Sequence, residues 1–228
     1  FLMGSEPTWN DIRCGAASVR NCENDLTEKF LKCREAKQNS ILIVTGTAGS
    51  GKSSIVKSLA LKLHEQGKHS GWIDQSHMPH PRIIKEAIEK EPTPTTIFIE
   101  DAYNYRQNLE PLIRDLCSSN KKITLVVVLR SNGVEKLLGD ISKDTRFIEF
   151  SVPHLTDNDI DGLLDSLDKF NRLGVLKGED RRSQHDIFKS KCGSQLLVAM
   201  IEATSGLDFD KKCTSEYEEL TDQEKRFY

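Results

Sequence analysis

Two kinds of apolar pattern alternate along the first two thirds of this 228-residue chain. Short β-branched runs predict buried strands, because parallel strands covered on both faces are almost continuously apolar. These strands are expected at residues 41–44, 71–73, 95–99, 123–130 and 147–150. Apolar residues with a helical repeat predict helices at residues 24–37, 55–67, 81–90, around 112–116, and 133–139. Such alternation predicts an α/β fold, with a five-stranded, mostly parallel sheet covered by helices on both faces.

After Pro153 the pattern changes, and only helical segments are predicted. Thr156 followed by Asp159 is typical of a helix start, and a leucine-rich stripe comes directly after it. We therefore expect three regions. These are an N-terminal segment and helix at residues 1–37, an α/β core at 38–152, and a small helical lid subdomain at 153–228.

A complete Gly-x-x-x-x-Gly-Lys-Ser motif joins the first predicted strand to the next helix. It reads Gly46-Thr47-Ala48-Gly49-Ser50-Gly51-Lys52-Ser53, with Ser54 following in the helix. Glycines let the backbone wrap closely around a phosphate chain, and the helix directs the positive end of its dipole at the same anion. In such a loop the lysine reaches the β- and γ-phosphates, and the serine hydroxyl ligates Mg²⁺. The motif predicts a site for a nucleoside triphosphate and Mg²⁺.

Two acidic residues, Glu100 and Asp101, follow the strand predicted at residues 95–99. At this position one carboxylate can hold Mg²⁺ while the other orients or deprotonates a water molecule. Position along the strand favours Glu100 for the metal and Asp101 for the water, and the reverse assignment stays open.

Arg130 ends the most apolar strand of the chain. Ligand-contacting residues of an α/β sheet gather at the carboxyl ends of its strands, and an arginine there can bind a γ-phosphate. No Asn-Lys-x-Asp guanine-reading motif is present, so adenine is the expected base.

Composition and charge further restrict the class of protein. The net charge of −3 creates no field that would attract nucleic acid, and no apolar run is long enough to predict a membrane span. The six cysteines are scattered without a Cys-x-x-Cys pair, as expected for reduced thiols in the cytoplasm.

Together these features resemble the STAND class of P-loop NTPases, particularly prokaryotic members from anti-phage defence proteins, which are relatives of NLR immune receptors. The resemblance rests on the phosphate loop, the paired acids, the strand-end Arg130, and three shorter runs. Those runs are Val19-Arg20-Asn21-Cys22-Glu23, Val152-Pro153-His154-Leu155-Thr156, and Cys192-Gly193-Ser194-Gln195-Leu196-Leu197. It implies an ATP-binding and slowly hydrolysing switch, in which ADP/ATP exchange controls self-association and a fused effector.

The same resemblance implies neighbouring domains. The chain begins at Phe1 and stops at Tyr228 inside a predicted helix, so we expect a piece of a longer protein. An effector would precede it, and a winged-helix domain with a repeat sensor would follow. The family's N-terminal segment often crosses the base, which makes Trp9 a candidate for contacting adenine.

Three alternatives stay open at this point. An AAA+ motor or loader, of the origin-recognition or clamp-loader type, shares the sheet, the loop and the acids. A small-molecule kinase would need a basic lid, for which only Arg181-Arg182 is available. A degenerate scaffold would bind nucleotide without hydrolysing it.

Overall fold

The computed structural model describes residues 6–73, 79–100, 102, 106–117, 119–131, 146–191, 196–205, 214 and 217–218. The chain forms two compact units. Residues Arg20–Pro153 make the sheet unit, and the segments Phe1–Val19 and His154–Tyr228 make the helical unit.

The sheet unit contains five strands in the order β2-β3-β4-β1-β5, and every neighbouring pair is parallel. Their bounds are β1 Ser40–Gly46, β2 Ser70–Ile73, β3 Thr95–Ile99, β4 Ile123–Arg130 and β5 Arg146–Ser151. All five lie where the apolar runs predict them, and the expected α/β class is confirmed.

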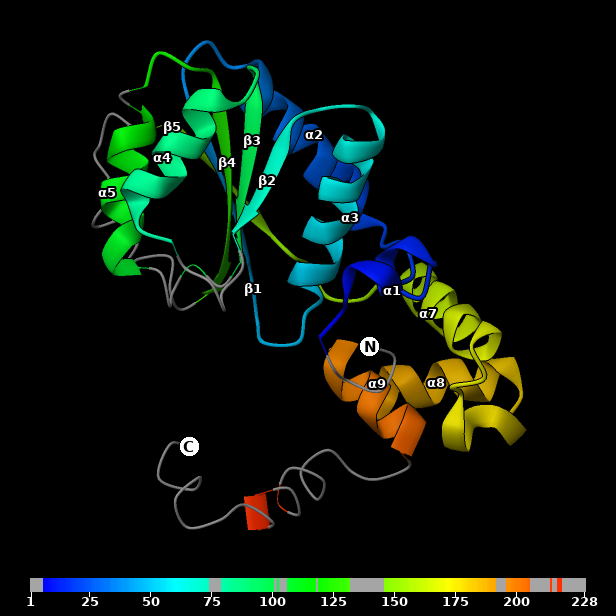
Figure 1. Ribbon diagram of the computed structural model, residues 1–228. Coiled ribbons are helices and arrows are strands. Elements are labelled where there is room, and N and C mark those ends of the chain that lie inside the picture. Colours follow the sequence, from blue (N-terminus) through cyan, green and yellow to red (C-terminus); the bar gives the residue numbers. More distant parts are fainter. Residues whose placement is uncertain are drawn as a thin grey trace. The chain divides into compact units, whose positions relative to one another are not determined.

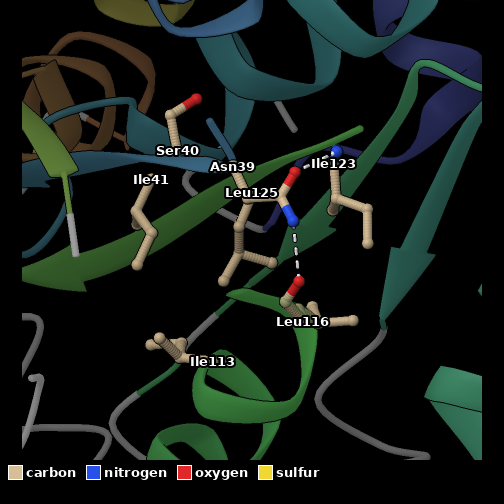
Figure 2. Close-up of a pocket in the computed structure, with 7 residues that line it drawn as sticks. All are labelled: Asn39, Ser40, Ile41, Ile113, Leu116, Ile123 and Leu125. Carbon is tan, nitrogen blue, oxygen red and sulfur yellow. Dashed lines mark hydrogen bonds between the residues drawn. The ribbon is translucent and has the colours of Figure 1, made fainter. Parts of the chain in front are cut away.

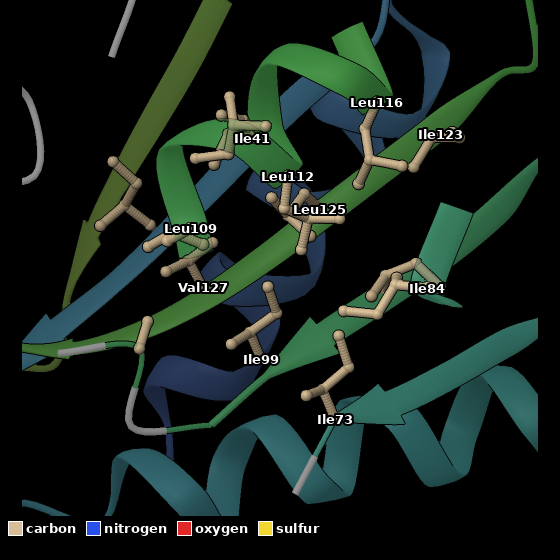
Figure 3. Packing of buried hydrophobic residues seen from close by; sticks show 14 of the residues in the cluster. Ile41, Ile73, Ile84, Ile99, Leu109, Leu112, Leu116, Ile123, Leu125 and Val127 are labelled. Atoms are coloured by element: carbon tan, nitrogen blue, oxygen red, sulfur yellow. The ribbon is translucent and has the colours of Figure 1, made fainter. Parts of the chain in front are cut away.

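Among the described residues, two helices lie on each face of the sheet (Figure 1). Helices α4 (Pro81–Lys90) and α5 (Arg106–Cys117) lie on one face, and α2 (Cys22–Glu35) and α3 (Lys52–Glu65) lie on the other. Side chains alternate between the faces along each strand, so Ile41 and Ile43 join the α4/α5 core while Leu42 and Val44 join the α2/α3 core. Figure 3 shows the α4/α5 core, in which leucines of α5 lie over the isoleucines and valines of the central strands.

At the amino-terminal edge of the sheet, Asn39 joins three backbone groups, of which Figure 2 shows those of Leu116 and Ile123. Its amide nitrogen donates to the carbonyl oxygens of Leu116 and Ser119, and its Oδ1 accepts from the Ile123 amide at 2.8 Å. A small cavity lies beside Asn39, lined mainly by isoleucine and leucine side chains. This edge is opposite the strand ends that carry the phosphate loop, so Asn39 belongs to the fold rather than to the site.

The described helices of the helical unit are α1 (Trp9–Arg13), α7 (Asp157–Lys169), η2 (Gly174–Gly178), α8 (Arg181–Lys191) and α9 (Leu196–Ser205). A separate apolar core, which includes Leu164, Leu167 and Phe188, holds its C-terminal helices together. The Thr156 hydroxyl accepts from the Asp159 amide, and the Asp159 carboxylate accepts from the Thr156 amide, which makes the expected helix start a capping box.

The predicted helix at residues 133–139 lies outside the described residues. Among the helices that are described, none has the length and hydropathy needed to cross a bilayer.

Candidate functional site

The phosphate loop connects the end of β1 to the start of α3, as its position after an apolar strand predicts. Gly49 and Gly51 have φ values of 69° and 86°, in the left-handed region that favours glycine. A Cβ atom at Gly46 would lie only 2.7 Å from the Ser50 hydroxyl oxygen. The conformation of the loop therefore favours glycine at positions 49 and 51, and a side chain at position 46 would force Ser50 to move.

The loop leads into a helix terminus suited to an anion. Gly51 occupies the N-cap position of α3 and has no side chain to cap the helix. The first turn of a helix has no intrahelical acceptors for its amide groups, here those of Lys52, Ser53 and Ser54. The Ser50 hydroxyl is also buried without a hydrogen-bond partner in the described structure. These polar groups fit the phosphates of a nucleotide.

Lys52 bends back over its own loop. Its Nζ donates to the carbonyl oxygens of Gly46 and Thr47, at 3.0 and 2.6 Å. Both acceptors are neutral, so negatively charged phosphate oxygens would make stronger partners for the same ammonium group. The lysine is thus held next to the position that the motif predicts for it.

Glu100 lies directly after β3 and is buried, with 8% of its surface exposed. Its Oε2 is 3.3 Å from Nζ of Lys57, a lysine of α3 that is also buried. Its Oε1 is buried without a hydrogen-bond partner among the described residues. Lys57 was not predicted from the sequence, where its only signal is its spacing four residues after Ser53, which is one helical turn.

Arg130 ends β4 and is exposed. In the register of the sheet it lies opposite Gly46, the first residue of the phosphate loop. Strand β4 lies between β1 and β3, so Arg130 comes between the phosphate loop and Glu100 along the carboxyl ends of the strands. The axes of β1 and β3 are about 10 Å apart, which is twice the spacing of neighbouring strands. The structure therefore brings the predicted loop, acid and arginine to one edge of the sheet.

A buried polar network attaches α2 to the phosphate loop and to α3. Arg20 donates to the carbonyl oxygens of Ser50 and Pro153, both at 3.0 Å. Glu23 accepts from the Arg20 amide and, through its Oε2, from Ser58 and Lys62 at 2.9 and 2.8 Å. The Arg20 and Glu23 positions were recognisable in the sequence as a motif, but their partners on α3 were not.

For three of the predicted sites, the described residues do not show a position next to the phosphate loop. Asp101 lies outside the described residues, as does the run from Cys192 to Gln195. Trp9 is 40% exposed and belongs to the helical unit, so its contact with adenine stays a prediction.

The residues present fit a nucleotide with Mg²⁺. Ser53 lies in the first turn of α3, and Glu100 presents a carboxylate oxygen without a protein partner in the described structure. Hydroxyl and carboxylate oxygens are the ligands that Mg²⁺ prefers in phosphate-binding sites.

Comparison with known families identifies a matching family model. The family model described as Novel STAND NTPase 5 matches residues 1–141, more than half of the chain. No curated protein matches the chain significantly.

Comparison with solved structures gives matches to the fold at low identity. The S. cerevisiae Hsp104-ADP complex has a TM-score of 0.58 at 13% identity, over 91% of this chain and 32% of that one. The Thermotoga maritima RuvB Holliday junction branch migration motor has a TM-score of 0.53 at 12% identity, over 81% of this chain and 60% of that one. This chain therefore spans only part of these neighbours, and the likeness concerns the P-loop NTPase fold alone.

Proposed function

Because this chain belongs to the Novel STAND NTPase 5 family, we propose that it is the ATP-binding, slowly hydrolysing switch module of a larger signalling protein. One observation carries the proposal. The phosphate loop, the buried Glu100 and the strand-end Arg130 meet at one edge of the sheet, in a chain of a STAND family.

In the proposed mechanism, Lys52 and the amide groups of the loop hold the β- and γ-phosphates. Ser53 and Glu100 would hold Mg²⁺, which neutralises phosphate charge when it is bound. Exchange of the Gly46 and Thr47 carbonyl oxygens for phosphate oxygens would release Lys52 from its present partners. The hydrogen bonds of the lysine would therefore differ between the empty and the nucleotide-bound loop.

Turnover is assigned to the neighbouring strand ends. Asp101 would position the attacking water, and Arg130 would donate to the γ-phosphate from the end of β4. A γ-phosphate is present in ATP and absent in ADP, so an arginine that binds it distinguishes the two nucleotides. This difference is what a switch requires, because a ligand shifts an equilibrium only through differential affinity for the two states.

The wider role is proposed from the resemblance to STAND proteins. We propose a cytoplasmic protein in which exchange of ADP for ATP promotes self-association and activates a fused effector, with anti-phage defence as the biological setting. Sensor and effector domains would belong to the full-length protein. Adenine is proposed as the base because the sequence lacks a guanine-reading motif.

The direct test is to denature the purified protein and identify the nucleotide that it releases by ion-exchange chromatography. Stoichiometric ADP is expected for a resting switch that retains its product. Guanine nucleotide would contradict the adenine assignment. A protein that neither carries nor binds nucleotide would contradict the proposal as a whole.

A second candidate is an AAA+ motor or loader, favoured by the fold shared with Hsp104 and RuvB. RuvB is described as a branch migration motor, so this alternative includes action on DNA. Nucleotide-free protein that hydrolyses added ATP rapidly, with further stimulation by DNA, would support the motor over the switch.

A further inference from the structure

A buried lysine, Lys57, forms an ion pair with Glu100, the acid that is expected to hold the metal. The side chains of Lys57 and Glu100 are only 9% and 10% exposed, and Nζ lies 3.3 Å from Oε2. The ammonium group also lies 5.7 Å from the centre of the Trp72 ring, which stacks on Phe98. Lys57 is therefore enclosed by α3 and the sheet instead of reaching into solvent.

Such an arrangement is costly unless the charges compensate each other. Removing two ions from water carries a large penalty, and the mutual attraction of the pair offsets it only when the geometry is good. Here Glu100 supplies the negative charge that allows Lys57 to be buried, while the aromatic face of Trp72 adds a weaker attraction. The pair is neutral as a whole, and Glu100 keeps one oxygen, Oε1, without a protein partner in the described part of the chain.

The position of Lys57 connects this pair to the nucleotide site. Lys57 follows Ser53 by one turn of α3, so the lysine and the predicted metal ligand lie one above the other along the helix. A metal ion held by Ser53 and Glu100 would share the Glu100 carboxylate with the Lys57 ammonium. Two cations at one carboxylate repel each other, and burial weakens the screening between them.

We propose that Lys57 is an internal counter-cation that competes with Mg²⁺ for Glu100 and sets the Mg²⁺ requirement for nucleotide binding. This inference rests on the proposed nucleotide-binding function. With Lys57 in place, Glu100 is neutralised without a metal, and nucleotide can be held at low Mg²⁺. Mg²⁺ then binds only at a concentration sufficient to overcome the lysine.

The experiment measures binding of fluorescent mant-ADP to the whole chain while free Mg²⁺ is raised from zero in a metal buffer. The variant is Lys57→Met, which keeps an unbranched side chain one atom shorter and removes the charge. The matched control is Lys62→Met on the same helix, because Lys62 also pairs with a buried carboxylate, that of Glu23, at 2.8 Å. Lys57→Arg is a second control that retains the cation.

If Lys57 competes with the metal, Lys57→Met lowers the free Mg²⁺ concentration at the midpoint of the titration. The expected decrease is about tenfold, the order expected when one charge is removed from a buried site. Lys62→Met and Lys57→Arg leave that midpoint close to the wild-type value. A variant that merely weakened the fold would not bind Mg²⁺ more tightly, so the direction of the change identifies the mechanism. If Lys57→Met does not fold, Lys57→Gln provides an uncharged hydrogen-bond donor, and the same decrease is expected.

An unchanged or higher midpoint in the folded variant would overturn the competition and leave nucleotide binding intact. Wild-type protein that binds no mant-ADP at any Mg²⁺ concentration would instead contradict the proposed function. The two failures are therefore distinguishable in the same titration.

Discussion

The guanidinium group of Arg20 donates a hydrogen bond to the carbonyl oxygen of Ser50, 3.0 Å away, and so connects the start of the sheet unit to the middle of the phosphate loop. Its other terminal nitrogen donates to Pro153, the last residue of the same unit. One buried side chain thus joins the loop to both ends of the segment that forms the sheet unit.

Replacing this side chain is expected to loosen the loop. Arg20→Ala removes two charge-assisted hydrogen bonds from buried surroundings, which should lower the free energy of unfolding by about 2–4 kcal/mol. It should also weaken ADP binding about tenfold, because part of the binding energy would be spent on ordering the loop. Chemical denaturation and calorimetric titration measure the two effects.

The control for that variant is Arg82→Ala, which removes an exposed ion pair with Glu86 on α4. Exposed pairs contribute little, so both measurements should stay close to those of the wild type. Equal losses in the two variants would show that Arg20 has no special connection to the loop.

Lys52→Ala is expected to abolish nucleotide binding while the fold is retained. The ammonium group donates to two carbonyl oxygens of the loop, and Lys52 belongs to neither apolar core of the sheet unit, so its loss should leave those cores intact. Binding of mant-ADP and the melting temperature should be measured on the same sample. Micromolar affinity for mant-ADP retained in this variant would contradict the assignment of the phosphate site.

A further prediction concerns Asn39, which lies at the ends of the strands opposite the phosphate loop. Asn39→Ala leaves the Ile123 amide and the Leu116 carbonyl without their side-chain partner, which should lower the free energy of unfolding by about 2–3 kcal/mol. Nucleotide affinity should not change, because the phosphate loop lies at the other ends of the strands. Asn120→Ala, an exposed change in the loop between α5 and β4 that Asn39 contacts, should have little effect on either quantity. A loss of nucleotide affinity in Asn39→Ala would contradict this separation.

Acidification is expected to destabilise the helical unit. A hydrogen bond from Thr8 lowers the pKa of Asp11 below its ordinary value of 3.8, and a hydrogen bond from Lys189 lowers the pKa of Asp157 in the same direction. A carboxylate with a lowered pKa in the folded state stabilises that state above the unfolded pKa, and the contribution disappears as the pH falls through the folded value.

Stability should therefore be constant down to about pH 4 and fall below it. Asp157→Asn should reduce the dependence on pH in this range, which thermal unfolding at a series of pH values can measure. The same dependence in wild type and variant would exclude Asp157 as a contributor.

Much of this fold follows from local patterns in the sequence. The β-branched run at 123–130 predicted the whole of β4, because a parallel strand buried on both faces is almost continuously apolar. The segment from Gly46 to Ser53 predicted the phosphate loop, because its amide groups, lysine and serine are contiguous and need no distant residue to define them. Thr156 and Asp159 likewise predicted a capping box that involves only a single turn of chain.

By itself, then, the sequence determined the α/β class, the loop and the acid at the end of β3, all of which depend on spacing along the chain. Only the tertiary structure decided the strand order, the position of Arg130 opposite Gly46, and the pairings of Lys57 with Glu100 and of Arg20 with Ser50. Apart from its spacing of one helical turn after Ser53, nothing in the sequence near Lys57 distinguishes it from a solvated lysine. Its role comes from burial against a carboxylate on another element, and packing alone brings those two groups together.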